Sequence, residues 1–212
     1  MCLIHSPHTL KFGGFLCYPD ISVHKGSFTF LTGVSGCGKS TYLKLLNRTL
    51  RPDQGELLYQ GKPLKDYPVL SYRREVLLVP QEVFLLDDTI RSNFDFYYGA
   101  RGDAPLSDEE IVSFLRICCT QFKPQDVCTS RSGGERQRVF LAIFLSLARK
   151  VLLLDEPTAA LDEATADRLL TKLRDFCRQR GLTVLCVCHS QHLKDSFADA
   201  VIELGGCVYA RA

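Results

Sequence analysis

The sequence predicts an α/β fold with a mainly parallel sheet, and three stretches carry the prediction. Val151–Leu154 is wholly apolar, and Thr183–Cys188 is a second apolar run of strand length. Continuous apolar strands are typical of parallel sheets that are covered on both faces. Between these runs, residues 163–180 place apolar side chains on one helical face and end at Gly181. The order strand, helix, strand therefore favours a βαβ unit.

The elements nearer the N-terminus follow the same rhythm. Residues 28–32 are expected to form a buried strand, which runs through a glycine-rich turn into a helix over residues 39–50. Two short strands are expected at residues 56–59 and 76–79.

One segment breaks this alternation of strands and helices. Between residues 88 and 128 no strand pattern is present, whereas residues 89–98 and 108–119 have helical spacing. The polar run 99–105, Gly-Ala-Arg-Gly-Asp-Ala-Pro, separates the two helical stretches. We interpret the segment as a helical insertion in the α/β core.

The composition is that of an ordinary globular protein, with 46% hydrophobic residues, 24% charged residues and a formal net charge of +2. Because a dedicated nucleic-acid binder has a basic excess, no nucleic-acid partner is expected. The longest apolar run, residues 139–148, is far shorter than the roughly 20 residues that span a bilayer. The N-terminus has no secretory pattern, and the ten cysteines have no zinc-binding spacing. We therefore expect a cytoplasmic chain with reduced, mostly buried cysteines.

The glycine-rich turn matches a phosphate-binding pattern. Residues 33–40, Gly-Val-Ser-Gly-Cys-Gly-Lys-Ser, fit G-x-x-x-x-G-K-[ST] between a predicted strand and a predicted helix, so a coincidental turn is disfavoured. The glycines let backbone N–H groups point at phosphates. Lys39 is suited to neutralise β- and γ-phosphate oxygens, and Ser40 to place a hydroxyl on Mg²⁺. The predicted nucleotide-binding residues here are Gly33, Val34, Ser35, Gly36, Cys37, Gly38, Lys39, Ser40 and Thr41.

Two adjacent carboxylates supply a second part of the predicted site. The apolar run 151–154 delivers Asp155 and Glu156 to the carboxyl end of a strand, the edge where open α/β sheets bind ligands. Asp155 suits the magnesium shell. Glu156 lies beyond the strand, where it is free to polarise a water aligned on the γ-phosphate; a solvated surface carboxylate is the alternative. ATP and Mg²⁺ are the cofactors that this pair and the glycine-rich turn predict.

A third motif exposes bare backbone in front of a helix. Ser132-Gly133-Gly134-Glu135 precedes the apolar run 139–148. A helix N-terminus without large side chains lets an anion approach the free N–H groups and the positive end of the helix dipole. The motif therefore predicts a second contact with phosphate.

These motifs resemble the ATP-binding cassette (ABC) ATPase family, whose signature is Leu-Ser-Gly-Gly-Gln, and the resemblance runs from about residue 3 to residue 204. Gln81 is similar to the family's Q-loop glutamine, Asp162 in Ala-Leu-Asp to its D-loop, and His189 to its switch histidine. The resemblance implies one P-loop NTPase domain over residues 1–212. Its parts would be an N-terminal antiparallel β region and a helical subdomain, at about residues 88–149, inserted in a RecA-like core.

The resemblance also implies roles for residues outside the glycine-rich turn. In the family two cassettes pair head to tail, so Ser132, Gly133, Gly134 and Glu135 would contact the ATP of the opposite subunit, and Asp162 would meet that subunit. Catalytic roles are implied for Glu156, for His189 at the γ-phosphate, and for Gln81, which would also sense Mg²⁺ beside Ser40 and Asp155.

Two positions leave questions open at this stage. Phe12 is expected to stack on adenine, and Tyr18 is the alternative. Arg131 departs from the family, which has leucine before the serine of the signature. The arginine is therefore expected to affect how the signature contacts its phosphate and how tightly a dimer closes.

The function that the resemblance implies is that of an ATPase subunit of a membrane ABC transporter. It would act as a homodimer on a separately encoded permease and lie at the inner face of the cell membrane. The chain looks most like the short cassettes of bacterial exporters, including those proposed to move iron. The helical insertion and the Gln81–Phe84 stretch are expected to form the docking groove, with Phe84 as anchor. The apolar residues Val83–Leu86 either line that groove or pack inward, and inward packing is an equal alternative for Leu85 and Leu86. The alternative is a soluble ABC ATPase that acts on nucleic acid or ribosomes.

Overall fold

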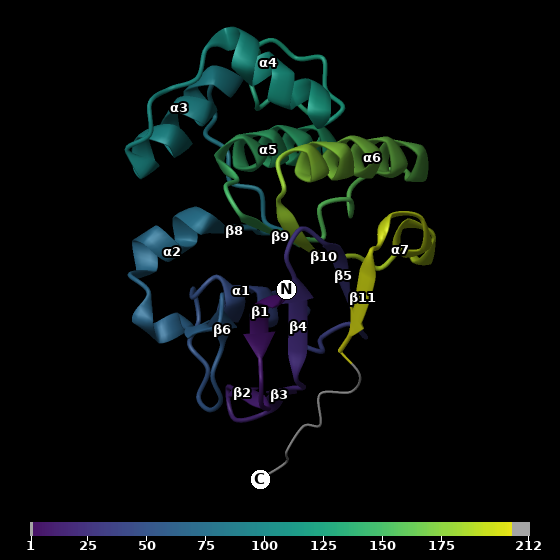
Figure 1. Cartoon of the computed structure of the whole chain (residues 1–212). Coiled ribbons are helices and arrows are strands. Elements are labelled where there is room, and N and C mark those ends of the chain that lie inside the picture. The colour runs from purple at the N-terminus through teal and green to yellow at the C-terminus, as the bar shows by residue number, and fades with distance from the viewer. Residues whose placement is uncertain (1, 205–212) are drawn as a thin grey trace.

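A parallel sheet forms the centre of the molecule, which the computed structural model describes over residues 2–204 (Figure 1). Within that part of the chain the strand order is β11-β5-β10-β9-β8, and each neighbouring pair is parallel. The prediction of a mainly parallel α/β sheet is confirmed. The strands are β5 (Phe28–Thr32), β8 (Val76–Val79), β9 (Val151–Asp155), β10 (Thr183–Val187) and β11 (Ala200–Glu203).

An antiparallel β region lies below the central sheet, as the family resemblance implied (Figure 1). Its strands run in the order β4-β1-β6-β7, and a separate hairpin joins β2 to β3. The bounds are β1 (Cys2–Ser6), β2 (Leu10–Phe12), β3 (Leu16–Tyr18), β4 (Ile21–His24), β6 (Leu58–Tyr59) and β7 (Lys62–Pro63).

Helices cover both faces of the central sheet. In Figure 1, α5 and α6 lie along its upper face with α3 and α4 beyond them, while α1 lies on the lower side. No helix of residues 2–204 combines the length and apolar character needed to cross a membrane. The helices are α1 (Lys39–Leu46), α2 (Val69–Glu75), α3 (Ile90–Arg101), α4 (Asp108–Ile117), α5 (Gly133–Leu147), α6 (Glu163–Gln179) and α7 (Gln191–Phe197), with a 3₁₀ turn at Leu64–Asp66.

Alternate residues of each central strand enter two different cores, because successive side chains of a strand point to opposite faces. In β9, Leu152 and Leu154 pack in the upper core with α3 to α6, whereas Val151 and Leu153 pack in the lower core with α1 and the antiparallel strands. This double burial is the physical reason that the strand sequence is apolar without interruption. It also fixes the carboxyl end of β9 firmly between the two layers.

The structure corrects several element boundaries. The helix expected over residues 39–50 ends at Leu46, because the Asn47 side chain turns away to donate to the Val76 carbonyl at 2.7 Å and Arg48 has a φ of 61°. Of the strand expected at residues 56–59, only Leu58–Tyr59 forms. Helices α3, α4 and α5 occupy the expected helical insertion, and the bounds of a subdomain at about residues 88–149 stay a prediction.

Candidate active site

The glycine-rich turn follows β5 of the parallel sheet and leads directly into α1. Gly33 begins it with a φ of 149°, and a Cβ built there would lie 2.7 Å from the Cys37 sulfur and 2.9 Å from the Leu204 carbonyl oxygen. A side chain cannot fit in that space, so the turn needs glycine at this position.

Lys39, the first residue of α1, is held inside the turn. Its side chain is only 6% exposed, and Nζ donates to the carbonyl oxygens of Gly33 at 2.9 Å and Val34 at 3.0 Å. These bonds place a full positive charge within the loop, at the N-terminus of a helix. Both features attract phosphate.

The predicted magnesium ligands Ser40 and Asp155 meet across the sheet edge. Ser40 Oγ donates to Asp155 Oδ1 at 3.0 Å, from α1 to the end of β9. Burial raises the pKa of the Asp155 carboxyl, while the hydrogen bond from Ser40 acts in the opposite direction. A hydroxyl and a carboxylate are hard oxygen donors of the kind that Mg²⁺ takes, so this donor set fits the ion.

The three predicted catalytic side chains converge one step further along the same edge. Glu156 Oε2 accepts from Gln81 Nε2 at 3.1 Å, and Glu156 Oε1 lies 2.8 Å from His189 Nε2. Gln81 follows β8, Glu156 follows β9 and His189 follows β10, so three neighbouring parallel strands deliver them. The sequence placed each residue after a strand; the structure shows that they touch.

Glu156 itself is held in an uncommon backbone conformation, with a φ of 52°. For a residue other than glycine this left-handed conformation costs about 1–2 kcal/mol. Its side chain is 22% exposed, and that of His189 is 53% exposed. The site therefore keeps a partly shielded carboxylate within reach of solvent, as activation of a water requires.

Gln137 is a functional candidate that the sequence analysis missed. It lies on α5, is buried, and donates from Nε2 to the backbone carbonyl of Glu156 at 3.1 Å. In the sequence, Gln137 is an amide among the apolar residues that form the buried face of this helix. Buried polar groups are normally hydrogen-bonded, so this position could have been identified as one with a specific partner. Through this bond, the helix behind the Ser132–Glu135 motif is attached to the residue that follows β9.

The Ser132–Glu135 motif forms the N-terminus of α5. Ser132 Oγ accepts from the Glu135 backbone N–H at 3.3 Å, and Glu135 Oε2 accepts from the Ser132 N–H at 2.8 Å. Backbone and side-chain hydrogen bonds from Ser132 lower the pKa of the Glu135 carboxyl. Ser132 and Gly133 are exposed, as the prediction of a second phosphate contact requires. A Cβ on Gly134, in contrast, would lie 2.8 Å from the Ala160 carbonyl oxygen.

Arg131 is anchored within its own chain and does not extend freely into solvent. Its Nη2 lies 3.2 Å from Asp126 Oδ2, and its guanidinium stacks 4.3 Å from the centre of the Phe122 ring. The side chain is 25% exposed. The unusual residue before the motif therefore fastens the 122–126 loop to the start of α5.

Asp162, the expected dimer contact, caps α6: its exposed carboxylate accepts from the Thr165 N–H at 2.9 Å. Hydrogen bonds from Thr165 lower the pKa of this carboxyl. The two candidates for adenine differ in exposure. Tyr18 is fully buried and its hydroxyl donates to the Gly38 carbonyl at 2.9 Å, whereas Phe12 is half-buried in the β2–β3 hairpin. The hairpin tip also carries Phe15, 47% exposed, which sequence reasoning had not considered.

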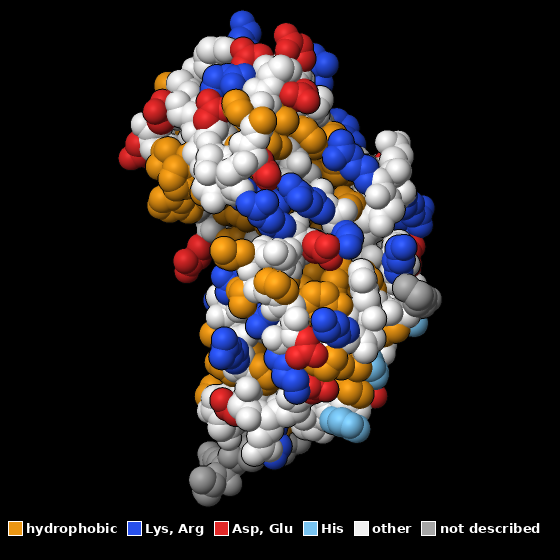
Figure 2. Space-filling view, turned by 60° about the vertical axis from the view of Figure 1, so that its left-hand side comes forward, with side chains coloured by type: hydrophobic (Ala, Val, Ile, Leu, Met, Phe, Trp, Pro, Cys, Tyr) orange, Lys and Arg blue, Asp and Glu red, His pale blue; other side chains and the backbone are white. Residues whose placement is uncertain are grey.

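A group of aromatic rings reaches the surface on the same side as α3. We define the aromatic surface as Phe84, Phe96, Tyr97 and Phe144. Phe84 is 59% exposed and Phe96 is 44% exposed, with their ring centroids 6.2 Å apart. The Tyr97 hydroxyl donates to the Phe84 carbonyl at 2.8 Å. Figure 2, which turns this side forward, shows hydrophobic side chains at the surface of the helical part among charged groups.

The described geometry defines a class of protein. A glycine-rich turn with a buried lysine, a serine–aspartate pair and a following glutamate, all at one edge of a parallel sheet, is the arrangement of P-loop ATPases. The helices inserted between β8 and β9 carry the Ser132–Glu135 motif. That combination of parts is the one which the sequence resemblance implied.

Comparison with known proteins identifies the family. The sequence model described as ABC transporter matches residues 18–159. The chain is 35% identical over 189 residues to the "Probable iron export ATP-binding protein FetA" of Escherichia coli (strain K12), covering 87% of this chain and 82% of that protein. It is 33% identical over 207 residues to the "Phosphite import ATP-binding protein PxtA" of Stutzerimonas stutzeri, covering 91% and 74%. A solved ABC transporter ATP-binding protein from Pyrococcus furiosus aligns with a TM-score of 0.80 and 21% identity, over 96% and 98% of the two chains.

The chain therefore belongs to the ABC transporter family, and its enzymatic activity is ATP hydrolysis. The expected similarity to iron-exporter ATPases is confirmed by the match to FetA. Relatives named for export and for import match at comparable identity, so the resemblance does not fix a direction of transport.

Proposed function

We propose that this chain is the ATP-hydrolysing subunit of a membrane transporter, and that it acts as a homodimer on a separately encoded permease. The observation that carries the chemistry is the contact of Gln81 and His189 with the two carboxylate oxygens of Glu156. The chain would lie at the inner face of the cell membrane through its permease. No nucleic-acid partner is part of this proposal.

The proposed chemistry assigns one task to each side chain. Lys39 binds the β- and γ-phosphate oxygens. Ser40, Asp155 and Gln81 would hold Mg²⁺, which supplies further positive charge to those oxygens when bound. Glu156 Oε2 accepts a hydrogen bond from the attacking water and polarises it, while Gln81 orients that carboxylate. His189, whose Nε2 lies 2.8 Å from Glu156 Oε1, would donate to the γ-phosphate in exchange for that contact. Phe12 stacks on adenine, since Tyr18 is buried.

The proposed dimer uses the exposed start of α5. Ser132 and the N–H groups of Gly133 and Gly134 would contact the γ-phosphate bound by the opposite subunit, with the α5 dipole directed at it. Because Glu135 occupies the Ser132 hydroxyl and N–H within the chain, its contribution is to fix the turn. ATP would close the dimer and hydrolysis would reopen it, so that binding energy shifts a conformational equilibrium.

The aromatic surface is the proposed docking site for the permease. Large exposed aromatic rings are the residue type that dominates protein interfaces. Phe84 lies only three positions after Gln81, so a partner seated on this surface is close to the catalytic residues along the chain. A soluble ABC ATPase that acts on nucleic acid or ribosomes remains the competing function.

The experiment that tests the chemistry is the substitution Glu156→Gln. The phosphate-binding residues stay intact, so ATP should still bind, whereas phosphate release should fall by at least 100-fold, on the order of a lost general base. Hydrolysis at close to the wild-type rate would remove Glu156 from this role.

The experiment that tests the partner is purification from detergent-solubilised membranes after coexpression with candidate permeases. A transporter subunit should bring down a membrane protein in stoichiometric amounts. If it brings down only soluble proteins or nucleic acid, the transporter assignment is wrong and the competing function takes its place.

A further inference from the structure

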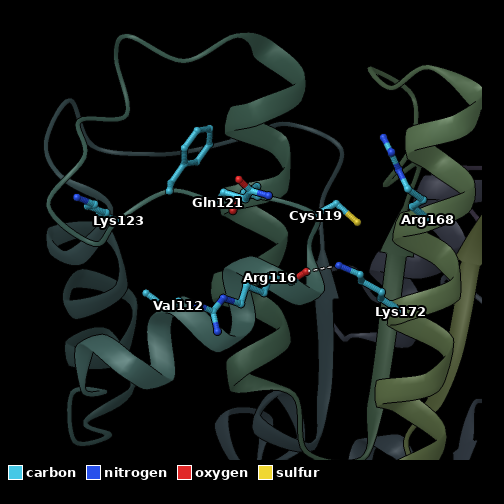
Figure 3. Close-up of a pocket in the computed structure, with 9 residues that line it drawn as sticks. Val112, Arg116, Cys119, Gln121, Lys123, Arg168 and Lys172 are labelled. Atoms are coloured by element: carbon cyan, nitrogen blue, oxygen red, sulfur yellow. Dashed lines mark hydrogen bonds between the residues drawn. The ribbon is translucent and has the colours of Figure 1, made fainter.

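A large pocket lies outside the site described above. It encloses about 900 Å³, compared with about 380 Å³ for the hollow beside Glu156 and His189. Its walls come from α4, from the loop after α4 and from α6 (Figure 3). None of the residues lining it has a role in ATP binding or hydrolysis. A volume of this size accommodates a small-molecule ligand.

The pocket is basic, and its charges are not neutralised within the chain. Arg116, Lys123, Arg168 and Lys172 line it, and no carboxylate does. Within residues 2–204 none of the four forms an ion pair with a carboxylate. Asp175 lies in the adjoining hollow with Arg116 and Lys172 but makes no ion pair with either. The pocket therefore has a concentrated positive potential.

A second basic hollow shows that this arrangement is not a general feature of the surface. Lys25, Arg149, Lys150 and Arg180 line that hollow. There, Arg149 pairs with Asp103 at 3.2 Å and Lys150 pairs with Glu75 at 2.9 Å, so carboxylates already offset the charge. Of these two basic hollows, the one between α4 and α6 has four cations without such partners among the described residues.

Two of the four cations are held in place. Lys172 Nζ donates to the Arg116 carbonyl oxygen at 2.9 Å, the dashed line in Figure 3. Arg168, one turn earlier on α6, donates from Nη2 to Thr165 Oγ1 at 3.1 Å. Figure 3 shows both side chains on the same side of α6, facing the loop that carries Cys119 and Gln121. Because these two side chains are already ordered, less conformational entropy would be lost when an anion binds to them.

We propose that this pocket binds a small soluble anion that carries two or more phosphate groups. Guanidinium groups bind phosphate oxygens as a planar fork and ammonium groups bind them as point charges, and the pocket offers two of each. A single phosphate, with a charge of about −2, would leave about half of that positive charge unmatched. Gln121, which also lines the pocket, adds an uncharged amide for orientation.

The position of the pocket connects it to the start of α5. Phe122 forms part of its wall, and the same ring lies 4.3 Å below the guanidinium of Arg131. Arg131 directly precedes Ser132. An anion in the pocket therefore rests against the loop to which Arg131 is fastened.

The test is calorimetric titration of inorganic pyrophosphate, without Mg²⁺ and at about 0.1 M salt, into the Lys39→Ala protein, whose phosphate-binding turn is disabled. One binding event is expected. Adding Arg168→Gln and Lys172→Gln should lower the affinity at least 10-fold, because both lost charges face the ligand. Lys25→Gln with Arg51→Gln removes the same charge from exposed positions elsewhere and should leave the affinity unchanged. All four positions are exposed, and circular dichroism checks that each variant is folded.

A second readout locates the bound anion. Cys119 lines the pocket and is half-buried, so pyrophosphate should slow its alkylation by N-ethylmaleimide in the Lys39→Ala protein. Cys2, half-buried in β1, serves as the internal control and should react at the same rate with and without pyrophosphate. The proposal is wrong if the Lys39→Ala protein does not bind pyrophosphate, if both charge variants bind equally well, or if Cys119 is not protected. If vesicles of phosphatidylglycerol bind in an Arg168- and Lys172-dependent manner while pyrophosphate does not, the charges serve a membrane surface and the soluble-ligand proposal is overturned.

Discussion

Replacing Gln137 by methionine should slow ATP hydrolysis without weakening ATP binding. The amide of Gln137 donates to the Glu156 carbonyl at 3.1 Å, beside the Ala159 backbone N–H at 3.2 Å, and Glu156 has a strained φ of 52°. A buried hydrogen bond is worth about 1–1.5 kcal/mol, which is comparable to the cost of that backbone conformation. Without the side-chain bond, only the local Ala159 N–H holds that carbonyl, so Glu156 relaxes more easily toward ordinary φ values and its carboxylate shifts away from Gln81 and His189.

Converted to a rate, a loss of that size lowers kcat roughly 5- to 10-fold. The KM for ATP should change little, because Lys39 and Ser40 do not contact Gln137 in the described bonds. Steady-state phosphate release over a range of ATP concentrations measures both constants. Gln125→Met is the control: Gln125 is exposed and donates to Asp108 at 2.7 Å rather than to Glu156, so its loss should leave kcat unaltered. An unchanged kcat for Gln137→Met, or a rise in KM alone, would refute the positioning role.

Three further outcomes are expected. Phe84→Ala should weaken permease binding by about 1–2 kcal/mol in a pull-down yet preserve basal hydrolysis. Leu70→Ala, at an even more exposed apolar site on α2, should change neither, and full retention of the permease by Phe84→Ala places the docking site elsewhere. Arg131→Leu should lower the free energy of unfolding, measured with urea, by about 1 kcal/mol, because the stacking on Phe122 and the ion pair with Asp126 are both lost. No change would show that these two contacts contribute nothing to stability. Asp155→Asn should raise the Tm at pH 7 without nucleotide or Mg²⁺, because burial raises the pKa of Asp155 and its charged form therefore destabilises the folded chain. This destabilisation is lost as the pH falls through the raised pKa, and an unchanged Tm at pH 7 would contradict the reasoning.

Local patterns were sufficient for much of the fold. The strands at residues 28–32 and 76–79 were predicted with their observed bounds, because short apolar runs between turn residues carry their own signal. Helices α2 and α7 were missed, since seven residues are too few to show a helical period. The end of α1 at Leu46 depends on the bond from Asn47 to Val76, a partner distant in sequence.

The candidate site divides in the same way. The glycine-rich turn and the pair Asp155-Glu156 follow from contiguous residues, so the sequence was enough to propose them. Gln137 gained its significance only when α5 was packed against the end of β9. The anchoring of Arg131 needs Phe122 and Asp126 on a loop that has no regular pattern. Contacts between distant segments are set by tertiary packing, which local propensity does not encode.

Gly133 and Gly134, the adjacent glycines at the start of α5, differ in how well they tolerate substitution. A methyl group on Gly133 would meet nothing within 4 Å, so a Gly133→Ala substitution causes no steric clash within the subunit. A methyl group on Gly134 would strike the Ala160 carbonyl at 2.8 Å and push aside the segment that ends in Asp162. A single inherited change at Gly134 would therefore disturb two contact regions of the proposed dimer at once. Packing within the subunit therefore requires glycine at position 134, whereas at position 133 only the contact in the proposed dimer would require it.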